Sequence, residues 1–149
     1  MLAEFSYASG DRDSKHGRTG TFDSLSPTNH LIYGVADLVG LRNIEHVRGG
    51  AECKPYRKLK LAADYHAYWL ANRYDHFYNA AGAIAVRVPR GGALSKQVGR
   101  EADLYAVYTV SGQMGLGAGY GYLFPGRFLK QYSPGSGTSY PYVFLDYKF

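Results

Sequence analysis

Several features are scarce or missing in this chain of 149 residues, and each absence argues against a class of protein. Its single cysteine, Cys53, excludes an internal disulfide and argues against a cysteine-based metal site or a thiol nucleophile. No stretch approaches the ~18 consecutive apolar residues that a membrane-spanning helix needs. The sequence also has no nucleophile elbow and no cluster of metal ligands. We therefore expect neither an enzyme nor a protein with a cofactor or a structural metal.

A signal peptide is missing as well, because the opening "MLAEFSYASGDRD" turns polar within a few residues. An exported protein would need such a peptide. The chain is therefore either cytosolic or a piece that begins after the natural N-terminus. The opening already reads as a strand in progress, which favours the second interpretation.

Tyrosine and glycine are abundant, with 15 and 19 copies, and this pairing favours β-sheet with tight turns over helix. The formal net charge of +5 indicates an acidic partner: nucleic acid, an anionic membrane surface or an anionic ligand. A charge of this size also serves solubility alone. The basic residues are scattered rather than arranged in a stripe, so we expect no nucleic-acid partner.

Alternating hydrophobicity predicts six strands in a single domain spanning residues 1–149. In the clearest strand, "QMGLGAGYGYLF", Leu116 and Tyr120 share one face with other apolar residues, and four glycines lie on the opposite face. Such a glycine face suits a wall that borders a water-filled space or is approached closely by other parts of the chain. We place the strands near residues 1–9, 43–54, 58–71, 98–110, 113–124 and 139–149.

The predicted strands are joined by short turns at 55–57 and 111–112 and by long loops at about 10–42, 72–97 and 125–138. Short turns on one side, long loops on the other and aromatic residues near strand ends are typical of outer-membrane barrels. We therefore predict an all-β fold, antiparallel and up-and-down, that forms the C-terminal portion of a larger transmembrane β-barrel. The alternative is a soluble barrel or sandwich that turns its apolar face inward and binds a carbohydrate or other ligand.

Four stretches together resemble the alginate export family of bacterial outer-membrane proteins: "TFDSLSPTNHLIYGVADLVGLRN", "YHAYWLANRYDHFYNAAG", "VGREADLYAVY" and "GYGYLFPGRFL". The resemblance covers about Phe5 to Phe149 and matches the carboxy-terminal part of the family, whose members have more strands upstream. It implies passive export of an anionic, alginate-like exopolysaccharide from periplasm to cell surface. A less selective porin for small anionic or sugar solutes is the alternative. The aromatic end at Phe149 implies recognition by the barrel assembly machinery, and the location implies contact with outer-membrane lipids and lipopolysaccharide.

If the apolar face meets lipid, the opposite face lines a channel and carries charges of both signs. Cations in a channel lining attract a polyanion and let it pass between weak sites, whereas opposite charges on neighbouring strands brace the wall. For conduction we select Arg48 and Lys60, the pH-dependent His46 and His66, and Arg127 and Lys130 in a loop that could narrow the mouth. The candidates for charge pairs in the lumen are Glu52, Asp64, Glu101, Asp103, Asp146 and Lys148.

The long loops add further basic residues that would concentrate an acidic polymer at the mouth or bind lipopolysaccharide phosphates. They are Arg12, Lys15, His16, Arg18, Arg73, Arg87, Arg90, Lys96, Arg127 and Lys130. Asp11 and Asp13 faintly resemble the start of a calcium loop but lack its distal glutamate, so a solvated turn is favoured. Asp75 and His76 either line a sugar-binding rim or simply order their loop.

Overall fold

The computed structural model describes residues 1–13, 19–25 and 32–149, and its main feature is a six-stranded antiparallel sheet in the order β1-β2-β3-β6-β7-β8. Consecutive strands of this sheet are neighbours, so the predicted up-and-down order is confirmed. The strands are β1 (Leu2–Ala8), β2 (Ile44–Tyr56), β3 (Leu59–Leu70), β6 (Gln97–Thr109), β7 (Met114–Pro125) and β8 (Thr138–Tyr147). The sheet does not close on itself, and β1 and β8 are its edges.

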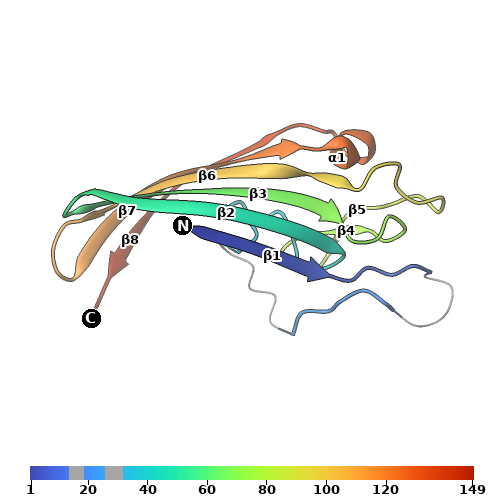
Figure 1. Cartoon of the computed structure of the whole chain (residues 1–149), viewed down its shortest axis with the longest axis horizontal. Coiled ribbons are helices and arrows are strands. Elements are labelled where there is room, and N and C mark those ends of the chain that lie inside the picture. Colours follow the sequence, from blue (N-terminus) through green and yellow to red (C-terminus); the bar gives the residue numbers. More distant parts are fainter. Residues whose placement is uncertain (14–18, 26–31) are drawn as a thin grey trace.

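The connections are short at one end of the sheet and long at the other, as Figure 1 shows. The β2–β3 and β6–β7 hairpins lie at the left of that view, and the three long connections lie at the right. The β2–β3 turn sits later than predicted, because β2 runs on to Tyr56 through an irregularity between Cys53 and Tyr56. Pro55 lies within this irregularity; a proline cannot donate to the ladder, so strands accommodate it at edges and bulges.

The long connections also contain regular elements that the alternation did not predict. Strands β4 (Phe77–Tyr78) and β5 (Ile84–Val86) form a small hairpin, and helix α1 (Arg127–Tyr132) lies between β7 and β8. A helix of six residues is marginal by itself. The buried side chains of Phe128 and Leu129 hold it against the ends of the strands.

The sheet exposes apolar side chains on its outer face and buries polar ones on its inner face, which is the reverse of a soluble barrel. The outer face exposes large apolar side chains, among them Leu104 and Leu145, each 60% exposed. The inner face, on which the long loops pack, buries His46, His66 and Glu101 completely. The soluble alternative requires the apolar side chains to pack inward, and their exposure contradicts it. This distribution is the one expected where lipid covers the outer face.

Among the described residues, the hydrophobic core lies at the loop end of the sheet, where the connections fill the inner side. It joins Ile44 and Leu70 of the strands to Val39, Phe77 and Phe128 of the loops and α1. The rings of Phe77 and Phe128 meet edge to face at 6.2 Å. This core fixes the loops against the sheet and so shapes the mouth of the inner face.

The glycines of β7 make room for aromatic rings from the next strand. Gly117 is paired with Phe144 and Gly119 with Tyr142. A Cβ atom on either glycine would collide with the ring of its partner. Of the two explanations given for this glycine face, the structure supports close approach by another part of the chain, in this case the side chains of β8.

Candidate channel lining

A buried polar cluster crosses strands β2, β3 and β6 on the inner face. His46 Nε2 and His66 Nδ1 are 2.9 Å apart and share one hydrogen bond, and their rings stack with centroids separated by 5.1 Å. His66 Nε2 lies 3.4 Å from Asp103 Oδ2, close enough for attraction but without the alignment of a hydrogen bond. Tyr68 stacks on His46 at 5.1 Å. The register places these side chains side by side because His46 pairs with Tyr68 and Asp64 with Asp103.

The segment at residues 32–40 folds inward and rests on this cluster. The backbone N–H of Val35 donates to Asp103 Oδ2 at 3.3 Å, and that of Ala36 donates to Glu101 Oε1 at 3.2 Å. The hydroxyl of Tyr68 donates to the carbonyl of Tyr33 at 3.0 Å. The inner face is therefore partly covered by a loop that is anchored through its own backbone.

Gly34 allows this close approach. Its φ of +92° lies in the left-handed region, and a Cβ atom there would collide with the carboxylate of Glu101. The prediction from sequence treated residues 10–42 as one long loop and missed this contact. The available signal was the apolar content of the loop, since Val35, Leu38 and Val39 are unusual for a segment that faces only water.

Two ion pairs brace strands β2 and β3 nearer the hairpin end. Arg48 donates to both carboxylate oxygens of Asp64, at 3.3 Å from Nε and 3.0 Å from Nη2. Lys60 Nζ lies 2.6 Å from Glu52 Oε2. Gly50 leaves space for the Asp64 carboxylate, which a Cβ atom would displace. The two strongest candidates for conduction, Arg48 and Lys60, are thus both compensated by a neighbouring carboxylate.

These paired side chains border a hollow on the inner face. Its volume is about 300 Å³, and its lining includes Arg48, Glu52, Asp64 and Tyr105. The pair of Arg48 and Asp64 is largely buried, with side chains 16% and 14% exposed, whereas the side chains of Lys60 and Glu52 are more exposed, at 35% and 56%, and of these two only Glu52 lines the hollow. A passing solute would therefore meet both signs of charge here.

The remaining selected residues lie apart from this lining. Asp146 is exposed on the edge strand β8, and Lys148 follows its end. Neither takes part in an ion pair within residues 1–13, 19–25 and 32–149. Arg127 and Lys130 are exposed on α1, beside Arg100 of β6.

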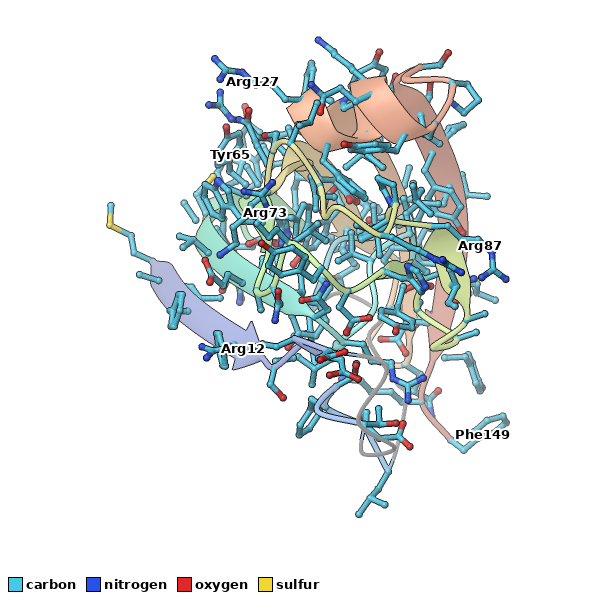
Figure 2. All side chains as sticks on the ribbon, turned by 90° about the vertical axis from the view of Figure 1, so that its right-hand side faces the viewer. Arg12, Tyr65, Arg73, Arg87, Arg127 and Phe149 are labelled. Atoms are coloured by element: carbon cyan, nitrogen blue, oxygen red, sulfur yellow. The ribbon has the colours of Figure 1, made fainter. Side chains whose placement is uncertain are left out.

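The basic loop side chains lie around the loop end of the sheet. Figure 2, viewed from that end, shows Arg12, which belongs to the connection between β1 and β2, and Arg73 and Arg87, which belong to the connection between β3 and β6. Arg90 is also exposed, whereas Lys96 is bound to Glu45 at 3.2 Å. Lys15, His16 and Arg18 lie outside the described residues.

Asp75 is the point at which two loops are joined. Its carboxylate accepts hydrogen bonds from the N–H of Asp11 at 2.8 Å and the hydroxyl of Thr21 at 2.6 Å. It also accepts from the N–H of His76 at 2.7 Å and the hydroxyl of Tyr78 at 2.9 Å. All four donors belong to the chain itself, so this arrangement fits the ordering of a loop, the second of the two roles proposed for Asp75 and His76.

The calcium-like turn has a simple local structure. The N–H of Asp13 donates to Asp11 Oδ1 at 3.0 Å, which is an Asx turn. No group of three or more potential metal-binding side chains comes together in the described part of the chain.

A profile of the alginate export family matches residues 1–143, from the first strand into β8. The chain belongs to the alginate export family. Members of this family are outer-membrane β-barrels that transport polysaccharide, and the open six-stranded sheet is part of the wall of such a larger barrel. No curated protein sequence matches the chain. No helix in the described residues is long and apolar enough to cross a membrane.

Proposed function

We propose that this chain forms part of the wall of an outer-membrane channel through which an anionic polysaccharide leaves the periplasm passively. One observation carries the proposal: charged side chains are buried on the inner face of the sheet, and large apolar side chains are exposed on its outer face. Membership of the alginate export family supports the class of cargo.

The distribution of charge supports weak, repeated contacts rather than one tight site. On the inner face the cations Arg48 and Lys60 are matched by carboxylates. Exposed loop cations lie at the mouth instead: Figure 2 shows Arg73 and Arg87 there, and the exposed Arg90 belongs to the same connection. Cations at a mouth raise the local concentration of a polyanion, while compensated charges along the wall release it again.

Transport through the complete barrel that contains this sheet, reconstituted in liposomes, tests this proposal. Two labelled oligosaccharides of equal length are compared, one built of uronates and one neutral. We expect faster passage of the uronate at low salt and a smaller difference at high salt, because salt screens the attraction at the mouth. The triple variant Arg73→Glu, Arg87→Glu and Arg90→Glu should slow the uronate and leave the neutral sugar unchanged. Equal rates for both sugars in the parent protein would instead support the less selective porin.

A charge-swapped variant separates conduction from bracing at Lys60. The double substitution Glu52→Lys and Lys60→Glu keeps the ion pair but exchanges its ends. If the pair only braces the wall, flux and stability stay at the parent level, whereas Lys60→Glu alone loses stability by like-charge repulsion. A change in uronate flux in the swapped protein would show that the position of the cation matters to the cargo.

A further inference from the structure

The outer face carries a basic hollow at the loop end of β6 and β7, away from the channel lining. The hollow has a volume of about 310 Å³. Three exposed cations line it, Arg100 from β6 and Arg127 and Lys130 from α1, together with Phe124. Arg100 pairs with Phe124 across β6 and β7, and both side chains are on the outer face with Leu104. In Figure 2 Arg127 points away from the loops, on the same side as Tyr65 of the outer face.

Backbone geometry holds the three cations together. The N–H of Gly126 donates to the carbonyl of Val98 at 2.7 Å, which ties the start of α1 to β6. A Cβ atom at Gly126 would crowd the backbone of Gln97 and Val98. This close approach places Arg127 beside Arg100, so their proximity does not depend on flexible side chains alone.

These cations lack carboxylate partners. No ion pair involves Arg100, Arg127 or Lys130 in the described part of the chain, whereas Arg42 and Lys96 at the same end are paired with Asp23 and Glu45. Three adjacent uncompensated cations repel one another. Such a cluster is suited to an anion that is supplied from outside the chain, and the planar guanidinium of arginine matches a phosphate group with two parallel hydrogen bonds.

The surroundings specify the kind of anion. Phe124 is half exposed and packs against Tyr122 at 4.6 Å, which marks the aromatic edge of the apolar outer face. A ligand in the hollow therefore meets hydrocarbon on one side and cations on the other. In outer-membrane barrels the long loops face the cell exterior, where the lipid headgroups are those of the outer leaflet.

We propose that Arg100, Arg127 and Lys130 bind a phosphate of lipid A, the phosphorylated glycolipid anchor of lipopolysaccharide. The site requires the chain to lie in the outer membrane but is independent of what passes through the channel. It gives Arg127 and Lys130 a role on the lipid side of the wall, in place of the constriction that the sequence suggested.

The test measures binding of purified diphosphoryl lipid A to the complete polypeptide in phosphatidylcholine nanodiscs. The triple variant Arg100→Gln, Arg127→Gln and Lys130→Gln should weaken binding on the order of a hundredfold, about fivefold for each basic residue at an anionic surface. The matched control is Arg73→Gln, Arg87→Gln and Arg90→Gln, which removes the same charge elsewhere at the loop end and should bind nearly as well as the parent. Equal weakening in both variants would overturn the site, since it would show general attraction only.

A second measurement uses the unmodified protein and does not depend on the folding of a variant. Lipid A from which both phosphates have been removed should fail to compete with the labelled diphosphoryl form, and inorganic phosphate should compete only weakly because it lacks acyl chains. Competition by the dephosphorylated lipid would refute phosphate recognition. Uronate flux through the triple glutamine variant should equal that of the parent, so failure of this site and failure of the transport proposal have different readouts.

Discussion

Replacement of Tyr68 by phenylalanine removes one oxygen atom from the completely buried centre of the inner face. That oxygen donates to the carbonyl of Tyr33 at 3.0 Å and lies 3.4 Å from Glu101 Oε2. The ring remains, so its stacking on His46 is kept. The variant therefore removes the hydrogen bond that ties segment 32–40 to the wall, together with the longer contact to Glu101.

The expected loss follows from the desolvated carbonyl that remains without its donor. A buried polar group left unsatisfied costs about 1–3 kcal/mol. Because the N–H groups of Val35 and Ala36 still bind Asp103 and Glu101, the segment should loosen rather than leave its place. We expect a loss of about 1–2 kcal/mol in the free energy of unfolding, the lower part of that range.

Two measurements check the reasoning. Urea unfolding of the complete polypeptide in lipid vesicles gives the stability, and hydrogen exchange gives the protection of the amides at Val35 and Ala36. The matched control is Tyr65→Phe in the same strand, on the exposed outer face, which should change neither. Unchanged amide protection in Tyr68→Phe, or an equal loss of stability in Tyr65→Phe, would refute the anchoring role.

Three further predictions concern other parts of the structure. Gly117→Ala should destabilise the protein by about 1–3 kcal/mol in urea unfolding through overpacking against the neighbouring strand, whereas Gly49→Ala, with open space around it, should not. Burial and the hydrogen bond to Asp75 raise the pKa of Tyr78 to about 12, so its neutral form contributes stability that is complete below about pH 10 and is lost as the pH rises toward 12. Asp75→Asn should lower the pKa of Tyr78. The pKa is read by ultraviolet titration, in which the signal of Tyr78 is the difference between a protein with Tyr78 and the same protein carrying Tyr78→Phe. An unchanged pKa in Asp75→Asn would contradict the assignment. Deletion of Phe149 should reduce the amount of folded protein in the outer membrane if the assembly machinery reads this end, measured by heat-modifiable gel migration beside a Phe149→Tyr control.

The strands could be predicted from sequence because their signal is local. Each strand alternates apolar and polar residues along its own length, so six strands with one apolar face each follow without knowledge of the neighbours, whereas the outward orientation of that face was inferred from strand length, loop asymmetry and the aromatic terminal strand. The placement of segment 32–40 could not be predicted in the same way. Its anchors are the backbone N–H groups of Val35 and Ala36, and every residue except proline has such a group.

The ion pairs on the inner face could not be predicted from alternation either, because they depend on the register between neighbouring strands. Arg48 meets Asp64 diagonally, since the register sets Arg48 opposite His66 and Asp64 opposite Gly50. Alternation identifies the face of each residue but not this offset. Helix α1 was missed for a related reason, because its stability comes from the burial of Phe128 against distant residues rather than from its own short sequence.

The arrangement of β8 on β7 has a consequence for the width of the bore. Because Gly117 and Gly119 have no side chains, the rings of Phe144 and Tyr142 lie over the backbone of the neighbouring strand instead of standing clear of it. A ring lying over backbone occupies roughly one van der Waals layer, about 3.5–4 Å, rather than the full length of the side chain. The wall can thus carry bulky aromatic groups on its inner side that project less far from it than upright side chains would.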